Sequence, residues 1–252
     1  MSIIVHGLFR YPVKGLKPQA LDEVSLVPDT PFPVDRAYAI EAGSGAFDEG
    51  APSFFRKTNF VQLMQHEALA HLETQFDDEG AVLTLSQKGD VAVSGSLKTA
   101  EGRAKIERFI AEFLGDELAG APRIVTAHDF HFTDVPRRSI SIINLASVRA
   151  LEEKIGHEID PERFRGNVVI EGTKPFEEFD WEGKSFRVGT AHFTGFHRIV
   201  RCPATQVNPA TAQRDLDIPA LLKTHFGHMD CGLYADVVQG GQMAVGDQLV
   251  VE

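Results

Sequence analysis

The sequence predicts a mainly β protein with a few helices (α+β), in which an N-terminal β domain packs on a second β domain. Its 252 residues fit one large β domain or two smaller ones. Short segments of β-branched or alternating residues recur along the chain, bounded by Gly, Pro or Asp. Helical periodicity is limited to a few stretches, so the pattern favours a closed or sandwiched β architecture over a βαβ layer.

The N-terminal half consists mostly of short predicted strands. Gln87-Lys88-Gly89-Asp90 has the composition of a tight turn, which joins the last two strands into a hairpin. The stretch from Phe60 to Leu72 is ambiguous and fits a strand, a turn and another strand. The predicted strands are Ile3 to Phe9, Glu23 to Val27, Val34 to Ile40, Ala81 to Ser86 and Asp90 to Ser94.

One helix is clear from apolar residues that recur with the helical period. Gly115 is a suitable C-terminal stop for it. The segment from Gly115 to Pro122 is rich in small residues and has no aromatic residue, so it is the candidate domain boundary. We therefore expect domains at residues 1–118 and 119–252. The residues that share one helix face are Ile106, Phe109, Ile110, Phe113 and Leu114.

The second half predicts further strands and two helices. Asn144 can cap a helix that Gly156 ends, and Pro219 can begin a short helix that runs to Phe226 and stops at Gly227. The predicted strands are Arg123 to Ala127, Arg138 to Ile143, Asn167 to Glu171, Phe186 to His192, Arg198 to Arg201, Leu233 to Val238 and Gln248 to Val251.

Composition excludes several classes of protein. A formal net charge of −11 argues against a general nucleic-acid binder or a membrane-surface binder, so neither partner is expected. The first residues do not have the pattern of a signal peptide, and no stretch approaches the length of a transmembrane helix. Two cysteines give no disulfide framework and suit a reducing cytoplasm, which is the expected location.

The most informative stretch is HRIVRCPATQVNPATAQRD, residues 197–215. Cys202 follows a predicted strand end, and Pro203 stops the ladder because proline has no N–H. Arg198 and Arg201 flank the thiol, and cations favour the thiolate form. A thiolate can be a soft-metal ligand, a nucleophile or a sulfur carrier. The alternative is a small buried hydrophobic residue.

Two cationic stretches lie in the N-terminal half. YPVKGLKP places Lys14 beside Gly15 in a turn, where an ammonium and backbone N–H groups can bind phosphate, although a solvated turn lysine explains it as well. VDRAYAI places Arg36 in a predicted strand, on the same face as Val34 and Tyr38. A covered guanidinium needs an anionic ligand or a carboxylate, and two acidic residues nearby could serve as that carboxylate. These are Asp35 and Glu41.

A third polar stretch is DPERFRGNVVIEG. Arg163 and Arg165 precede Asn167 at the start of a predicted strand. The amide of Asn167 offers both a donor and an acceptor, which suits the edge of a heterocycle such as a pterin. The alternative is a turn that positions the strand, with the two arginines bonded to Asp160 or Glu162.

Other kinds of site have weaker support. Three residues near the C-terminus have zinc-like spacing and two more histidines could complete the set, but the expected glycines and a paired CxxC are missing. The familiar hydrolase, P-loop and dinucleotide motifs are absent from the sequence, as are cysteine patterns for an iron–sulfur cluster or haem. The zinc candidates are His225, His228, Cys231, His128 and His131.

Taken in order, these stretches resemble the MOSC family of molybdenum-cofactor proteins. YPVKGL and VDRAY are similar to the N-terminal β domain of the family. FRGNVVIEG, PFEEFDWEGKSF, RCPATQVNPATAQRD and GLYADVVQGGQMAVGDQL are similar to the MOSC domain, a β-barrel. The resemblance is to the amidoxime-reducing branch, without an iron–sulfur domain. Three positions depart from the family pattern: Gly15, where relatives often carry Ser, Gly166, where Pro is common, and Ala212, where Gly is common.

The resemblance implies that Cys202 is the catalytic residue and the protein ligand of molybdenum. It implies that other residues hold the pterin and its phosphate, with Gly15 contributing a backbone N–H. No family ligand corresponds to Cys231. The implied cofactor-binding residues are Lys14, Gly15, Arg36, Arg165, Asn167, Arg201 and Asp247.

The function implied by the resemblance is an oxidoreductase that reduces small N-hydroxylated or N-oxide substrates. Because the chain shows no haem, flavin or iron–sulfur module, electrons are expected from a separate partner protein. The alternative is a non-catalytic carrier of molybdenum cofactor or of sulfur, held as a persulfide on Cys202. Pyridoxal phosphate is not expected, because no desulfurase-sized domain accompanies these motifs.

Overall fold

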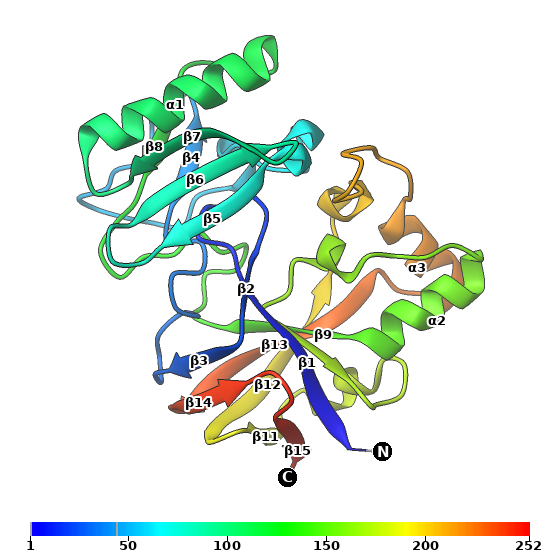
Figure 1. The fold of residues 1–252 in the computed structure, drawn as a ribbon. Coiled ribbons are helices and arrows are strands. Elements are labelled where there is room, and N and C mark those ends of the chain that lie inside the picture. The colour runs from blue at the N-terminus through cyan, green and yellow to red at the C-terminus, as the bar shows by residue number, and fades with distance from the viewer. Residues whose placement is uncertain (1, 44) are drawn as a thin grey trace.

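The computed structural model describes residues 2–43 and 45–252, and it confirms a mainly β fold. The larger unit is a closed barrel of seven strands (Figure 1). Its strands run in the order β10-β9-β13-β12-β11-β15-β1, and pairing of β1 with β10 closes it. The barrel strands are β1 (Ile3–Arg10), β9 (Ile140–Asn144), β10 (Val168–Glu171), β11 (Ser185–Val188), β12 (Ala191–Val200), β13 (Asp230–Gln239) and β15 (Gln248–Val251).

The first strand of the chain belongs to this barrel. Ile4 of β1 pairs with Glu171 of β10, and Ile3 pairs with Leu249 of β15, so both ends of the chain lie side by side (Figure 1). Strand β2 (Gln19–Leu21) pairs with β1, and β3 (Glu23–Leu26) pairs with β14 (Gly241–Ala244). The chain thus begins in the barrel, leaves it after β3 and returns at β9.

The smaller unit contains the sheet β5-β6-β7, the pair β4–β8 and helix α1, which lies against the sheet (Figure 1). Ile106, Ile110 and Leu114 of α1 are buried in its core, as the helical period predicts. Because β8 pairs with β4, the strand predicted at residues 123–127 packs in this unit. The elements are β4 (Ala39–Ala42), β5 (Glu73–Asp77), β6 (Val82–Gln87), β7 (Asp90–Ser96), α1 (Ala100–Leu114) and β8 (Pro122–Val125).

Two helices flank the barrel, and their ends are those the sequence predicts. The side chain of Asn144 caps α2 (Leu145–Ile155) by accepting a 2.9 Å hydrogen bond from Ala146 N. Helix α2 stops at Gly156 and α3 (Ile218–Phe226) stops at Gly227, both in the left-handed conformation. The hairpin turn is also confirmed, because Lys88 and Gly89 both have positive φ between β6 and β7.

Three predicted segments differ from the structure. The strand predicted at 34–40 is mostly a turn, because Val34 and Arg36 adopt positive φ (61° and 49°) and the strand begins only at Ala39. The strand predicted at 186–192 is a hairpin: β11 ends at Val188, and Gly189 (φ 55°) reverses the chain into β12. Residues 60–72 hold one isolated bridge and a 3-10 helix in place of two strands.

No helix in the described residues is long and apolar enough to cross a membrane.

Candidate functional site

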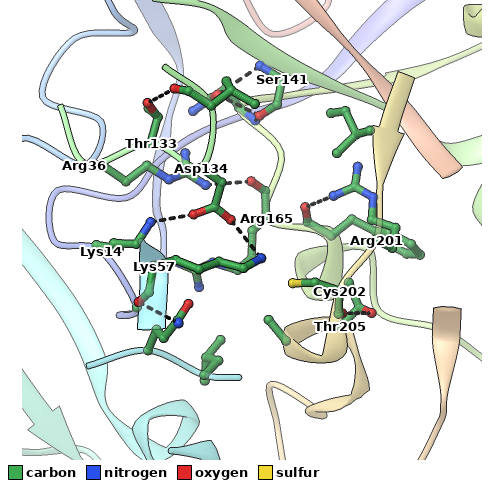
Figure 2. Close-up of a pocket in the computed structure, with 18 of the residues that line it drawn as sticks. Lys14, Arg36, Lys57, Thr133, Asp134, Ser141, Arg165, Arg201, Cys202 and Thr205 are labelled. Atoms are coloured by element: carbon green, nitrogen blue, oxygen red, sulfur yellow. Dashed lines mark hydrogen bonds and ion pairs between the residues drawn. The ribbon is translucent and has the colours of Figure 1, made fainter. Parts of the chain in front are cut away.

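A pocket lies between the smaller unit and the barrel (Figure 2). Both units contribute to its wall, and seven of the eight predicted site residues line it. Asp247 is the exception: it lies in the turn before β15, where its carboxylate accepts a 2.8 Å hydrogen bond from Ala244 N. The seven are Lys14, Gly15, Arg36, Arg165, Asn167, Arg201 and Cys202.

Cys202 follows β12 directly and stands at the start of the 3-10 helix Pro203–Gln206. Its carbonyl oxygen accepts hydrogen bonds from the backbone N (3.0 Å) and Oγ1 (2.9 Å) of Thr205, which fix the turn. The side chain is half-buried on the pocket wall, so a ligand in the pocket can reach the thiol. Cys202 thus stands at a strand end, as the sequence predicts, and it lines the pocket.

The Cys202 turn is held from behind by Arg163, which is 4% exposed. Arg163 donates to the carbonyl oxygen of Gln206 at 3.0 Å, and its Nη2 lies 2.7 and 2.9 Å from the two carboxylate oxygens of Asp215. In the described residues the Arg163 guanidinium forms no ion pair with the carboxylates of Asp160 or Glu162, the alternative partners from the sequence. Asp160 instead accepts a 3.1 Å hydrogen bond from Arg163 N at its carbonyl oxygen, and its side chain caps the short helix. Arg163 thus positions the Cys202 turn.

The two arginines beside Cys202 in sequence do not act as predicted. Arg198 lies 4.6 Å from the ring centroid of Phe179, with its Nε 3.8 Å from Glu182. Arg201 donates to backbone carbonyls, from Nε to Cys231 O at 2.7 Å and from Nη1 to Phe164 O at 2.8 Å. Their pairing with other groups weakens the argument that they favour a thiolate at Cys202.

Lys57, from the smaller unit, is the cation that interacts with Cys202, and the sequence analysis missed it. Burial lowers the pKa of Lys57, but the charge of Asp134, the charge of Cys202 and the hydrogen bond that Lys57 donates to Cys202 together raise it above the ordinary value. Figure 2 shows the Lys57 side chain directed to the space between Asp134 and Cys202. A lone lysine in a loop carries no sequence signal that would reveal this contact.

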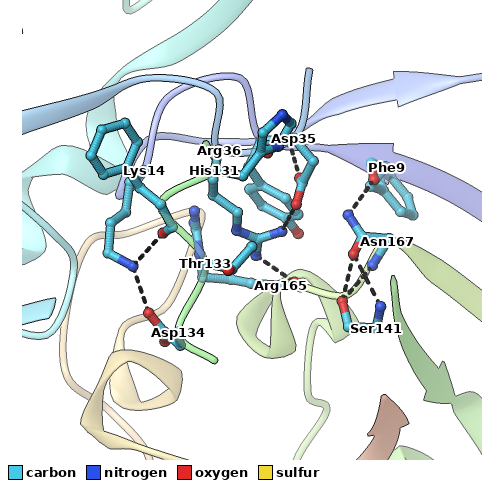
Figure 3. Close-up of polar contacts among 12 residues, drawn as sticks. Phe9, Lys14, Asp35, Arg36, His131, Thr133, Asp134, Ser141, Arg165 and Asn167 are labelled. Carbon is cyan, nitrogen blue, oxygen red and sulfur yellow. Dashed lines mark hydrogen bonds and ion pairs between the residues drawn. The ribbon is translucent and has the colours of Figure 1, made fainter. Parts of the chain in front are cut away.

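Lys14 and Asp134 form a close ion pair at the same wall (Figures 2 and 3). Lys14 Nζ lies 2.5 Å from Asp134 Oδ1 and 2.8 Å from the carbonyl oxygen of Phe132. Burial lowers the pKa of Lys14, and Asp134 opposes that shift. Burial raises the pKa of Asp134, but Lys14, Lys57 and Arg36 outweigh it and bring the pKa to about 2. Asp134 is therefore a carboxylate at neutral pH.

Arg36 and Arg165 both stack on the buried ring of Tyr11, with guanidinium carbons 4.5 and 4.2 Å from its centroid. Arg36 also forms an ion pair with Asp35, which confirms one of its two predicted carboxylate partners. The prediction of a strand at Arg36 is wrong. Arg165 donates to the carbonyl oxygen of Leu16 at 2.9 Å. Within the described residues no carboxylate lies at ion-pair distance from Arg165, and burial lowers its pKa.

Asn167 lines the pocket, but its side-chain amide forms hydrogen bonds with residues of the barrel (Figure 3). Its Oδ1 accepts hydrogen bonds from Ser141 N (3.1 Å) and Ser141 Oγ (2.8 Å), and its Nδ2 donates to Phe9 O at 3.2 Å. It therefore joins β1, β9 and β10 at the pocket. Contact with a ligand as well stays a prediction.

The backbone explains one departure from the family pattern, at Gly15, and does not explain another, at Ala212. Gly15 has φ 89°, and a Cβ there would lie 2.5 Å from the carbonyl oxygen of Val61, so this turn requires glycine. Ala212 adopts φ 56°, the left-handed conformation that favours the glycine common in relatives.

The zinc alternative finds no support in the geometry. Among the described residues no group of three or more His, Cys, Asp or Glu side chains is placed to hold a metal ion. Cys231 is 1% exposed, and burial raises its pKa to about 12, as expected for a thiol in the core. His228 packs against the rings of Phe176 and Phe179. His131 bonds to the carbonyl oxygen of Asp35.

Two family models together match residues 2–250 of the chain. The model of the MOSC N-terminal beta barrel domain matches residues 2–127, and the model of the MOSC domain matches residues 127–250. The chain belongs to the MOSC family. This agrees with a MOSC barrel that carries an N-terminal β domain, and the shared pocket lies where the two meet.

Relatives of this MOSC protein include molybdenum cofactor sulfurases. That of Anopheles gambiae is 31% identical over 105 residues, which are 37% of this chain and 13% of the sulfurase. That of Caenorhabditis briggsae is 24% identical over 235 residues, or 86% of this chain and 30% of the sulfurase. The chain thus spans less than a third of these relatives. The YUAD protein of Bacillus subtilis is a similar solved structure, with 13% identity, coverage of 100% and 96%, and a TM-score of 0.46.

Proposed function

We propose that this MOSC protein binds a molybdenum cofactor in the pocket between its two units. As an oxidoreductase it would reduce small N-hydroxylated or N-oxide substrates with electrons from a separate donor protein, in the reducing cytoplasm that its free thiols suit. The observation that carries the proposal is the meeting, in one pocket, of a reachable thiol, Cys202, with two guanidinium groups that have no carboxylate partner in the described residues, Arg165 and Arg201.

The charges of the pocket fit an anionic cofactor. Arg36 is paired with Asp35, while Asp134 alone serves both Lys14 and Lys57. Two further guanidinium groups donate only to carbonyl oxygens in the described part of the chain. Partly buried cations without counter-ions are unfavourable unless a ligand supplies the negative charge. These two guanidinium groups belong to Arg165 and Arg201.

The Cys202 thiol fits a soft metal. A thiolate is a soft ligand, and a pterin cofactor with a dithiolene group adds further sulfur to the coordination of molybdenum. When bound, the cofactor would supply the redox chemistry that removes oxygen from the substrate nitrogen. The protein contributes position: Arg163 fixes the Cys202 turn, Arg165 and Lys14 offer charge to the phosphate, and Asn167 fixes the wall between them.

The test is cofactor content and turnover in matched variants. We expect the wild type, loaded with molybdenum cofactor, to contain molybdenum and to show pterin fluorescence. It should also reduce an amidoxime with dithionite as the electron source. Cys202→Ala should lose most of the molybdenum and all turnover, whereas Cys231→Ala should keep both because that thiol is outside the pocket. Undiminished molybdenum in Cys202→Ala, or a loaded wild type without turnover, would refute the respective part of the proposal.

A second candidate function is a carrier of cofactor or sulfur. It is supported by the sulfurase relatives and by the reachable thiol, which can hold a persulfide. Pyridoxal phosphate is not part of this candidate. The carrier would show the mass of one extra sulfur atom on Cys202, removable by a reducing thiol, and no turnover of N-oxygenated substrates by the loaded protein. Intact-protein mass spectrometry distinguishes the two functions.

A further inference from the structure

Asp134 occupies the anion-binding position of the two pocket lysines. Its Oδ1 lies 2.5 Å from Lys14 Nζ, and its Oδ2 lies 3.7 Å from Lys57 Nζ. Throughout residues 2–43 and 45–252, no second carboxylate oxygen is found within ion-pair distance of either lysine. Lys14 lies in the connection between β1 and β2, and Lys57 begins the 3-10 helix Lys57–Asn59, so their convergence on one point is a property of the folded chain.

We propose that Asp134 is an internal counter-ion that a phosphate-class anion replaces, and that it thereby determines which ligand charges the pocket accepts. The inference builds on the proposed function, because the same pocket would hold the phosphate of the cofactor. Its central claim concerns only this chain's own residues and a free anion. It can therefore be tested without molybdenum.

The exposure of the three side chains shows which partner can leave. The Asp134 side chain is 44% exposed, while that of Lys14 is 8% exposed and that of Lys57 is 32% exposed. The carboxylate can rotate into water, where it is well solvated, but it then gives up its ion pairs, so the exchange needs an anion that restores them. Lys14 cannot follow it, and would keep only the carbonyl oxygen of Phe132. A buried ammonium left in this state favours the entry of another anion.

The segment that carries Asp134 also permits the exchange. Residues 133–139 lie between the pocket and β9 and contain neither helix nor strand. Thr133 Oγ1 donates to the carbonyl oxygen of Val135 at 2.8 Å, a bond within the segment itself that rotation of Asp134 leaves intact. Replacement of the carboxylate therefore requires no loss of sheet hydrogen bonds.

The arrangement favours anions with more than one charge. Asp134 brings a single negative charge, and it holds Lys14 much more closely than Lys57. A phosphate has three or more acceptor oxygens and up to two charges, so it can engage both lysines and also attract Arg36. A monoanion such as acetate offers nothing beyond what Asp134 already supplies. We expect phosphate to compete with Asp134 and acetate to fail.

The experiment is calorimetric titration of the cofactor-free chain with inorganic phosphate. Asp134→Asn removes both the competitor and its repulsion, so the Kd for phosphate should fall about tenfold or more relative to wild type. The matched control is Asp78→Asn, which makes the same change in net charge at an ion pair with Arg10 (2.8 Å) outside the pocket. The control should bind phosphate as wild type does.

The inference is overturned if Asp134→Asn binds phosphate no more tightly than wild type, or if Asp78→Asn tightens binding equally. A second measurement needs no variant: phosphate added to the wild type should shift the side-chain NMR signals of Lys14 and Lys57, and acetate should not. Equal shifts with both anions would also overturn it. Failure of the chain to retain molybdenum would refute the proposed function and leave the phosphate result unaffected.

Discussion

Arg36 donates a hydrogen bond from Nη2 to the carbonyl oxygen of Arg165 at 3.0 Å. This bond links the turn before β4 to the residues that lead into β10, and both guanidinium groups stack on Tyr11 beside it. The anion-binding groups of the pocket are thus joined across the two units. A pocket assembled in this way depends on the positions of its backbone turns, which the following predictions test.

The contacts of Arg163 with Asp215 and with the Cys202 turn are expected to raise the free energy of unfolding. Arg163→Met would remove the partner of Asp215 and the hydrogen bonds that Arg163 Nη1 donates to the carbonyl oxygens of Thr205 and Gln206. Because the arginine is buried while the Asp215 carboxylate is partly exposed, the loss should cost about 2 kcal/mol of unfolding free energy. Chemical denaturation measures this change. The control is Arg149→Met, whose exposed pair with Glu171 (3.5 Å) should be worth at most about 1 kcal/mol. Similar losses of unfolding free energy in both variants would contradict a special role of Arg163 in holding the Cys202 turn.

The turn at Gly15 is expected to reject the serine that relatives carry. Gly15→Ser would place a Cβ 2.5 Å from the carbonyl oxygen of Val61 in a residue with φ 89°, so unfolding free energy should fall by about 2 kcal/mol or more. Gly89→Ser is the matched control, because Gly89 has φ 90° with no atom near the new Cβ. Its unfolding free energy should fall only by the cost of placing a side chain at positive φ. Equal thermal shifts for the two variants would show that the contact with Val61 is unimportant.

The pH dependence of stability should report on Asp134. Its pKa is lowered from 3.8 to about 2 in the folded chain, so the unfolded state binds more protons between these values. The stabilisation is therefore present above about pH 4 and is lost as pH falls toward 2. In Asp134→Asn the slope of unfolding free energy against pH should be smaller in this window, as measured by urea denaturation. An unchanged slope would mean that the lysines do not hold this carboxylate in solution.

The sequence predicts which residues line the pocket better than it predicts which charged side chains pair there. Short motifs predict that Lys14, Arg165 and Cys202 belong to one site, and all three line the same pocket because each stands at a turn or strand end. Lys57 and Asp134 were missed because their relationship exists only after the two units pack together. No local pattern marks a lone lysine and a loop aspartate as partners.

The errors in secondary structure have the same origin. The alternation of its neighbours predicts a strand at Arg36, but Asp35 accepts a hydrogen bond from Tyr11 N at 2.8 Å and so helps fix a turn there. That bond joins residues far apart in sequence. The hairpin at Gly189 was also missed, since a glycine between two apolar runs does not reveal that Gln242 O lies 2.3 Å from its Cβ position.

The two thiols should differ in reactivity because one lines the pocket and the other is buried. Cys231 is 1% exposed, and burial raises its pKa to about 12, so the native chain should shield it from iodoacetamide. Cys202 is half-buried and faces the pocket, so it should take up one equivalent of reagent, and a second should add only in denaturant. Peptide mass spectrometry locates the label. Phosphate should slow the reaction of Cys202 if the anion occupies the pocket beside it, and early labelling at Cys231 would contradict the buried assignment.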